Sequence, residues 1–208
     1  MGKTEKEKLI DEFIKKLSEI EDSNDFDNPW KDPDKCENLK KFLLRSGIEY
    51  ILIGEAPGRK GCLKCGVPFC DDSTLKEIID ESKVIGKESK ETSAQRIYMA
   101  FKEDFVAWNV FPFHPKSENG KNRTPNSGEL EFGQEYLKSF LGIFKSSSAK
   151  IILVGKKAQE TFKKLNFEEP HIDISHPSTL ADRCRVKEGY ASGDKGWVDY
   201  IRKEVYKN

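Results

Sequence analysis

The sequence predicts an α/β protein of three layers, α/β/α, with a central four-stranded parallel sheet. Four short, largely apolar runs are the predicted strands, at 49–53, 105–110, 151–154 and 171–174. Short apolar runs of this kind favour strands that are buried on both faces. Segments with helical spacing separate the runs, and this alternation is typical of a parallel sheet that helices cover on both sides.

Two helices are predicted before the first strand. Apolar side chains recur every three or four positions over 4–20, which is the spacing of an amphipathic helix. Asp, Asn and Pro are frequent over 21–36, which predicts a loop. A second short helix over 36–46 is expected to end near Gly47.

The stretch between the first two strands divides into three parts. Residues 59–72 are rich in Gly, Cys and Pro and are expected to be irregular. A helix is predicted over 73–83, with Ser73 as its N-cap. Residues 84–98 are polar and show no clear period, so no element is assigned to them.

A long loop, 111–125, follows the second strand and leads into the second half of the chain. Gly155 ends the third strand, and Ser175–Ser178 follow the fourth. The helices of this half are predicted over 127–146, 156–165 and 194–205.

At 208 residues the chain has the length of one domain. We expect a single domain over 1–208, with 1–47 as a helical extension packed on it. The 36 basic and 36 acidic residues cancel, so any binding of nucleic acid depends on a local basic face. No apolar run is long enough to span a membrane, and the first residues lack the apolar core of a signal peptide. We expect a cytoplasmic protein of prokaryotic type, and a monomer.

Polar residues with catalytic or binding chemistry follow three of the four strands. Glu55 lies in the turn after the first strand, Asn109 at the end of the second and His176 just after the fourth. Right-handed crossovers bring the carboxyl ends of parallel strands to one edge of the sheet, where α/β proteins build their sites. The sequence therefore predicts a functional site that contains these three side chains.

Four segments, in this order, resemble the uracil-DNA glycosylase superfamily, most closely its thermophilic-type branch with a Gly-Glu-Ala-Pro-Gly first motif. The resemblance implies a uracil-DNA glycosylase-like fold. It also implies a monofunctional repair enzyme that flips uracil out of DNA and hydrolyses its N-glycosidic bond, leaving an abasic site. The segments are Gly54–Gly58, Gly66–Phe69, Trp108–Pro112 with Asn122–Pro125, and His176–Thr179.

The resemblance implies that Ala56, Phe69, Asn109 and His176 bind the flipped base. Phe69 would stack on the base, and the amide of Asn109 can donate and accept at once, as reading a pyrimidine edge requires. The backbone amide of Ala56 would bind a base carbonyl or a phosphate. The expected partner is DNA that contains uracil or another deaminated base. Hypoxanthine or xanthine specificity, or a non-catalytic module that binds DNA or a nucleotide, stays open as an alternative.

The implied catalytic residues are Glu55 and His176. A histidine that donates to the base carbonyl would stabilise the negative charge that develops on the leaving base. Glu55 would either position and deprotonate the attacking water or stabilise an oxocarbenium-like sugar by its charge. The other two histidines, His114 and His171, are expected to be structural.

The loop after His176 is the one that enters the duplex in this superfamily. Leu180 is the candidate wedge that fills the gap left by the flipped base. Ser178, Thr179, Arg183 and Arg185 are the candidate phosphate contacts. Further basic residues lie in loops near the same edge and are candidates for a local basic face: Arg59, Lys60, Lys64, Lys116, Lys121 and Arg123.

The five cysteines depart from the resemblance. Members of the thermophilic-type branch hold an iron–sulfur cluster with four cysteines, but here only Cys36 lies early and Phe113 stands about where a later ligand is expected. We therefore expect no iron–sulfur cluster. Three cysteines, with Cys36 or Cys184 as a fourth ligand, have a spacing that permits zinc. Free, partly buried thiols are the other reading, and a zinc-stabilised protein unrelated to repair is an alternative function. The three are Cys62, Cys65 and Cys70.

Overall fold

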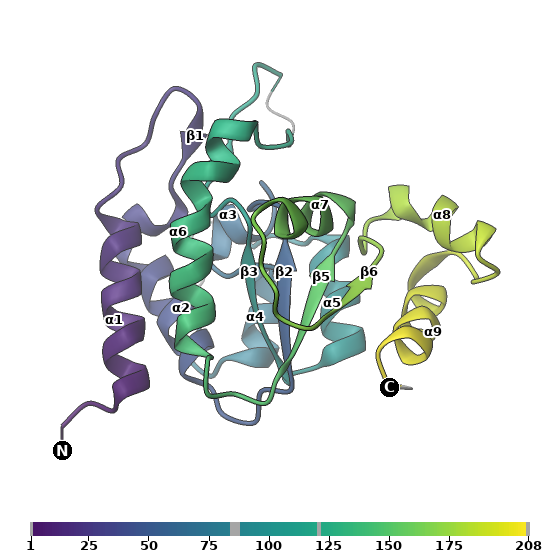
Figure 1. Ribbon diagram of the computed structural model, residues 1–208, viewed down its shortest axis with the longest axis horizontal. Coiled ribbons are helices and arrows are strands. Elements are labelled where there is room, and N and C mark those ends of the chain that lie inside the picture. The colour runs from purple at the N-terminus through teal and green to yellow at the C-terminus, as the bar shows by residue number, and fades with distance from the viewer. Residues whose placement is uncertain (1, 84–87, 120–121, 207–208) are drawn as a thin grey trace.

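A computed structural model of the chain describes residues 2–83, 88–119 and 122–206. At its centre lies a four-stranded sheet in which every neighbouring pair is parallel, and this confirms the predicted fold class (Figure 1). In spatial order its strands are β3 (Phe105–Asn109), β2 (Tyr50–Gly54), β5 (Lys150–Val154) and β6 (His171–Ile174).

The strand order creates a switch point between β2 and β5. From β2 the chain moves outward to β3, and it then returns past β2 to reach β5 and β6. Open α/β sheets bind their ligands in the crevice beyond the carboxyl ends of two such neighbours. Residues that follow β2, β3 and β6 therefore gather at one edge of the sheet.

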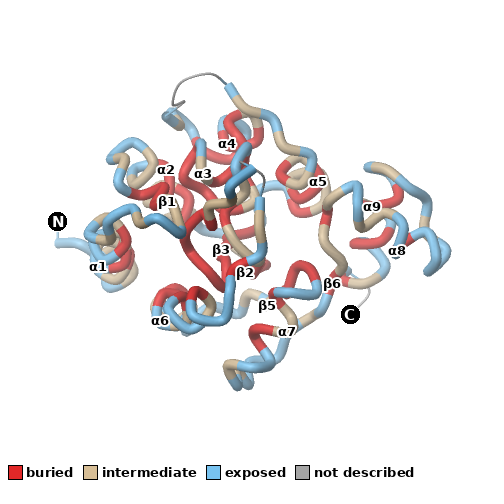
Figure 2. Tube along the Cα trace, turned by 90° about the horizontal axis from the view of Figure 1, so that it is seen from above, coloured by how far each residue is buried: buried red, intermediate tan, exposed pale blue. Residues whose placement is uncertain are grey.

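Helices cover both faces of the sheet (Figure 2). The two strands β2 and β3 are buried along their whole length, whereas only Ile174 of the edge strand β6 is buried. On one face lie α6 (Ser127–Ile143) and α7 (Lys156–Lys164), and on the other α4 (Asp72–Ile78) and α5 (Thr92–Phe101). Beyond β6, α9 (Gly193–Glu204) packs against α5 and against the short α8 (Asp182–Lys187). None of the helices in the described residues is long and apolar enough to cross a membrane.

The first 47 residues share the core of the sheet. Helix α1 (Glu5–Ser18) packs against α2 (Pro33–Leu44) and also contacts α6. The ring centroid of Phe13 lies 4.8 Å from that of Trp108 on β3, and Trp108 also stacks on Trp30 at 5.0 Å. Aromatic contacts of this kind bury large apolar areas, so these helices extend the main core.

Side-chain caps fix the starts of two helices and correct two predictions. Asp71, rather than Ser73, caps α4, because its carboxylate accepts a 2.8 Å hydrogen bond from the amide of Thr74. The Thr74 hydroxyl oxygen in turn accepts a 3.0 Å hydrogen bond from the Asp71 amide, which completes a capping box. Asp32 caps α2, so this helix begins before residue 36.

The remaining differences concern short or weakly patterned segments. The helix predicted over 73–83 ends at Ile78, and α5 occupies part of the unassigned stretch 84–98. Residues 84–87 lie outside the described residues. The sequence analysis did not predict α8, nor the following short elements: β1 (Phe26–Asp27), which pairs with β4 (His114–Pro115), η1 (Pro29–Lys31), α3 (Cys62–Cys65) and η2 (Thr179–Ala181).

Candidate active site

A cavity of about 370 Å³ lies at the carboxyl edge of the sheet. Its lining brings together the residues that the sequence placed at three strand ends, Glu55, Asn109 and His176. A volume of this size is at the lower end of the range of small-ligand sites. Other expected site residues that line it are Ala56, Phe69, Ser178 and Leu180.

Phe69 and Asn109 meet over Gly54, the last residue of β2. Asn109 is the register partner of Gly54 on β3 and is buried. The Phe69 ring lies against Gly54 on the cavity side, and its backbone has a φ of 57°. This left-handed conformation is rare for a bulky residue and points to a functional constraint. The cavity therefore has an aromatic wall beside a side-chain amide.

Glu55 is half-buried at the start of the turn after β2. Burial raises the pKa of its carboxyl above the ordinary value, while a hydrogen bond from Thr124 and the charge of Lys157 lower it. The loop that carries Thr124 also holds the turn directly, since the Asn122 side chain accepts a 3.1 Å hydrogen bond from the Arg59 amide. The net effect is a pKa above the ordinary value, so this carboxylate is a stronger base than an exposed glutamate.

His176 is held as a neutral hydrogen-bond donor. Its Nδ1 accepts a 3.1 Å hydrogen bond from the Ser178 amide, so the ring hydrogen is assigned to Nε2. Burial, followed by the nearby charge of Arg185, lowers the pKa of His176 to about 4. The ring therefore stays uncharged at neutral pH and can donate from Nε2.

His114 has a place in the site that the sequence analysis did not give it. It is buried, lines the cavity, and its Nδ1 lies 2.7 Å from the carbonyl oxygen of Pro57. Because a carbonyl only accepts, this nitrogen donates and anchors the turn after Glu55. His171, which is expected to be structural, begins β6 at the opposite edge of the sheet and contacts the ring of Phe162.

Glu91 is a second carboxylate in the cavity, and it is not among the residues predicted from the sequence. It is the N-cap residue of α5, yet its side chain makes no capping bond and lies over Gly58 and Gly61 instead. Burial, then the charge of Asp71, raises the pKa of Glu91 to about 6, against a smaller opposite effect of Lys60. No signal in the polar stretch 84–98 points to it.

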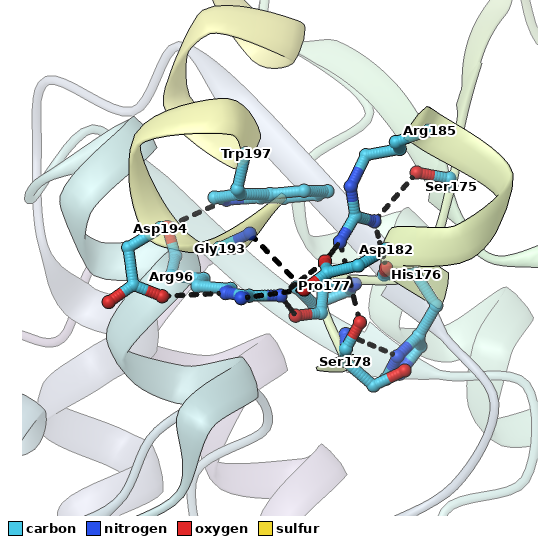
Figure 3. A network of polar contacts seen from close by, with 10 residues as sticks. All are labelled: Arg96, Ser175, His176, Pro177, Ser178, Asp182, Arg185, Gly193, Asp194 and Trp197. Atoms are coloured by element: carbon cyan, nitrogen blue, oxygen red, sulfur yellow. Dashed lines mark hydrogen bonds and ion pairs between the residues drawn. The ribbon is translucent and has the colours of Figure 1, made fainter. Parts of the chain in front are cut away.

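The loop after His176 presents most of its predicted DNA contacts outward. Leu180 is 84% exposed at the rim of the cavity, an unusual position for a large apolar side chain. Thr179 and Arg183 are exposed, and Ser178 is half-buried. Arg185 contradicts its prediction as a phosphate contact: it is fully buried and bonded within the protein (Figure 3).

The basic residues of the other loops fall into two groups. Lys60 and Lys64 are exposed. Lys116 pairs with Asp27 at 3.0 Å, and Arg123 forms a two-point ion pair with Glu129, so both brace loops. Arg59 is exposed as well, and Lys121 lies outside the described residues.

The three clustered cysteines are buried, and burial raises their pKa values, so they are thiols. The Cys65 thiol donates to the carbonyls of Val67 and Cys70, at 3.6 and 3.3 Å. Over the described ranges, no three His, Cys, Asp or Glu side chains gather in a way that could hold a metal ion. The arrangement of Cys62, Cys65 and Cys70 therefore does not fit the zinc site that their spacing permits.

A larger groove, of about 950 Å³, lies at the opposite edge of the sheet. Its lining includes Ile51, Ile151 and His171, which lie at the amino ends of their strands, and no described residue of the four family segments. The groove lies away from the carboxyl ends of the strands, where open α/β sheets bind their ligands. The smaller cavity is therefore the candidate active site.

The cavity thus combines an aromatic wall, a side-chain amide, a neutral histidine and a carboxylate. These are groups that an enzyme acting on a flipped base can use. Residues 44–191, more than half of the chain, match the family described as the Uracil DNA glycosylase superfamily, and the chain belongs to it. No curated protein matches. The crystal structure of wild-type SMUG2 from Pedobacter heparinus is similar, with a TM-score of 0.64 and 21% identity over 96% of this chain and 97% of that one.

Proposed function

We propose that this protein excises uracil from DNA by hydrolysis and leaves an abasic site. The observation that supports this most strongly is the convergence of Glu55, Phe69, Asn109 and His176 on one cavity at the switch point of the sheet. Each has the chemistry that one step of base excision requires. Membership of the superfamily supports the same reaction class.

Recognition of the base would depend on Phe69 and Asn109. A uracil flipped out of the helix stacks on the Phe69 ring, and such base–aromatic stacking contributes about 1–3 kcal/mol. The Asn109 amide donates to a ring carbonyl and accepts from the ring N–H. Cytosine carries an amino group and no N–H at the corresponding positions, so it leaves this amide unsatisfied.

Cleavage would combine His176 with Glu55. As the bond between C1′ and N1 breaks, its electron pair moves onto the base, and Nε2–H of His176 donates to the carbonyl oxygen that gains the charge. The oxygen of a water molecule bonds to C1′, and the Glu55 carboxylate takes the proton that this water loses. In the alternative role, the Glu55 charge stabilises the cationic sugar without accepting a proton.

Leu180 and its neighbours would hold the opened duplex. The exposed Leu180 side chain fills the gap left by the flipped nucleotide, while Thr179 and Arg183 contact phosphates beside it. DNA as the substrate fits the expected cytoplasmic location, and the monomeric state stays a prediction.

Incubation with matched oligonucleotides, each carrying uracil, hypoxanthine, xanthine or a thymine mispair, tests this proposal. Alkaline cleavage then reveals any abasic site. We expect product with uracil, no strand cleavage before alkali, and loss of product in Asn109→Ala. Product with hypoxanthine or xanthine but not with uracil would show that the proposed base is wrong. Tight DNA binding without any product would favour a non-catalytic module.

A further inference from the structure

Two buried arginines bind the main chain of the segment His176–Ser178, which we call the His176 segment. Arg185 donates to the carbonyl oxygen of His176 at 2.6 Å and to that of Ser178 at 3.4 Å (Figure 3). Arg96 donates to the carbonyl oxygen of Pro177 at 2.9 Å. Three consecutive carbonyls therefore bind guanidinium groups, a density of charge-assisted bonds that fixes a loop firmly.

Two aspartates neutralise these arginines. Asp182 accepts from Arg96 at 2.9 and 3.2 Å and also accepts from Arg185, so it bridges the two. Asp194 accepts from Nε of Arg96 at 2.8 Å. Because both arginine side chains are almost completely buried, the loss of one partner would leave an uncompensated buried charge.

Helix α9 completes this arrangement from outside the family match. Trp197 donates from its indole nitrogen to the carbonyl of Arg96 at 2.9 Å, and the Arg185 guanidinium lies 5.0 Å from the centre of the Trp197 ring. Asp194 and Trp197 both belong to α9, which begins after residue 191, where the family match ends. The C-terminal helix therefore contributes to the support of a motif in the active site.

We propose that Arg185 and Arg96 are positioning residues, which hold the His176 segment so that the imidazole faces the base and Leu180 faces the duplex. We call the group formed by Arg96, Asp182, Arg185 and Asp194 the arginine clamp. This inference rests on the proposed function, because it assigns a purpose to a loop that acts in base excision.

The clamp has two separable effects on His176. Its hydrogen bonds fix the main chain, and a displacement of about 1 Å at a catalytic group can cost on the order of 100-fold in rate. Its charge acts on the ring as well, because burial and then the positive charge of Arg185 lower the pKa of His176. A lysine at 185 retains the charge but loses the planar fork of donors.

Arg185→Gln and Arg185→Lys test both effects. We expect Arg185→Gln to lower the single-turnover excision rate by about 100-fold and to raise the pKa of His176, measured by NMR titration of labelled imidazole. Arg185→Lys should retain a low His176 pKa while the rate stays reduced. An unchanged titration together with an unchanged rate per folded molecule in Arg185→Gln would overturn the proposal.

Asp194→Asn tests the part played by α9 and disturbs the fold less, because this carboxylate is largely exposed. We expect a loss of roughly 10-fold in rate, because the asparagine oxygen can still accept from Arg96 but no longer carries the charge that strengthens this bond. Asp199→Asn is the matched control, since Asp199 lies on the same helix and pairs with Arg202 on the surface. Equal rates for the two variants would contradict the proposed link from α9 to the site.

The histidine titration separates failure of this inference from failure of the proposed function. If the wild-type protein releases no base, the proposed reaction is wrong, but the His176 pKa in Arg185→Gln still reports whether the clamp acts on the ring. If uracil is released while both variants behave like the wild type, the clamp alone is wrong.

Discussion

The ring of Phe69 lies so close to Gly54 that a Cβ built on this glycine would be 2.6 Å from Cζ of the ring. The same Cβ would be 2.7 Å from Oδ1 of Asn109. Real Cβ atoms do not approach other atoms this closely. Gly54 is therefore required for the close approach of the aromatic wall and the amide to β2, and not for an unusual φ angle.

Gly54→Ala should consequently damage the site more than the fold. The added methyl group displaces Phe69 or Asn109, so we expect single-turnover excision of uracil to fall by about 100-fold or more. Gly142→Ala on α6 is the matched control, because a Cβ there meets nothing within 4 Å. It should leave the rate unchanged and raise the stability by up to about 1 kcal/mol. A Gly54→Ala protein with full activity would show that Phe69 and Asn109 can shift without any loss of excision rate.

The sequence predicts much of the fold because its signals are local. Apolar runs and helical periods set the four strands and the long helices, and strand ends place Glu55, Asn109 and His176 at one edge. Very short elements such as η2 and α3 have too few residues to show a helical spacing of apolar side chains. Their bounds depend on tertiary contacts instead.

The errors at the site have a common cause, which is that side-chain burial depends on distant parts of the chain. The charged sequence around Arg185 predicts a surface position, but in helix α8 its side chain contacts Trp197 and Asp182 and is buried. Glu91 reaches the cavity from a stretch without a clear period. Neither position can be inferred from local spacing alone.

Leu180→Ala should separate duplex from single-stranded substrates. A wedge is needed only where a partner strand must be kept open, so we expect a rate loss of about 10-fold or more on duplex DNA and little change on single strands. Because the side chain is 84% exposed, the melting temperature should not change. Comparable losses on both substrates would mean that Leu180 contacts the flipped nucleotide itself.

The acid side of the pH–rate profile should report Glu55. Burial raises the pKa of its carboxyl above the ordinary value, and the protonated form cannot accept a proton, so the rate falls as the pH drops through this raised pKa. His176, with a pKa of about 4, remains neutral over most of this range and adds no second fall. Single-turnover rates measured from about pH 5 to about pH 8 test this.

The variant Glu55→Gln supplies the control for this profile. It should lower the rate by about 100- to 10,000-fold and remove the pH dependence of what remains. If the rate of Glu55→Gln still falls at acid pH with the same midpoint as the wild type, the group that titrates is not Glu55. A rate that survives nearly intact would argue against both roles proposed for this carboxylate.

Glu91 should make the protein less stable as the pH rises. Its pKa is 4.5 in the unfolded chain and about 6 in the folded protein, so the folded state binds more protons between these values. The stability is therefore highest below pH 4.5 and falls until about pH 6. A shift of this size corresponds to about 2 kcal/mol, which lowers the melting temperature of a chain of this length by about 4–8 °C.

Glu91→Gln removes that ionisation and should raise the melting temperature by several degrees at pH 7.5, but not at pH 4.5. Differential scanning calorimetry at both pH values, compared with the wild type, checks this. Glu88→Gln is the matched control, since Glu88 lies in the same stretch, is exposed and pairs with Lys76 at 2.8 Å, so its loss brings no gain. If Glu91→Gln and the wild type melt together at pH 7.5, the carboxylate is ionised there without cost. A gain in stability would instead mean that the cavity keeps a destabilising charge, as sites selected for function often do.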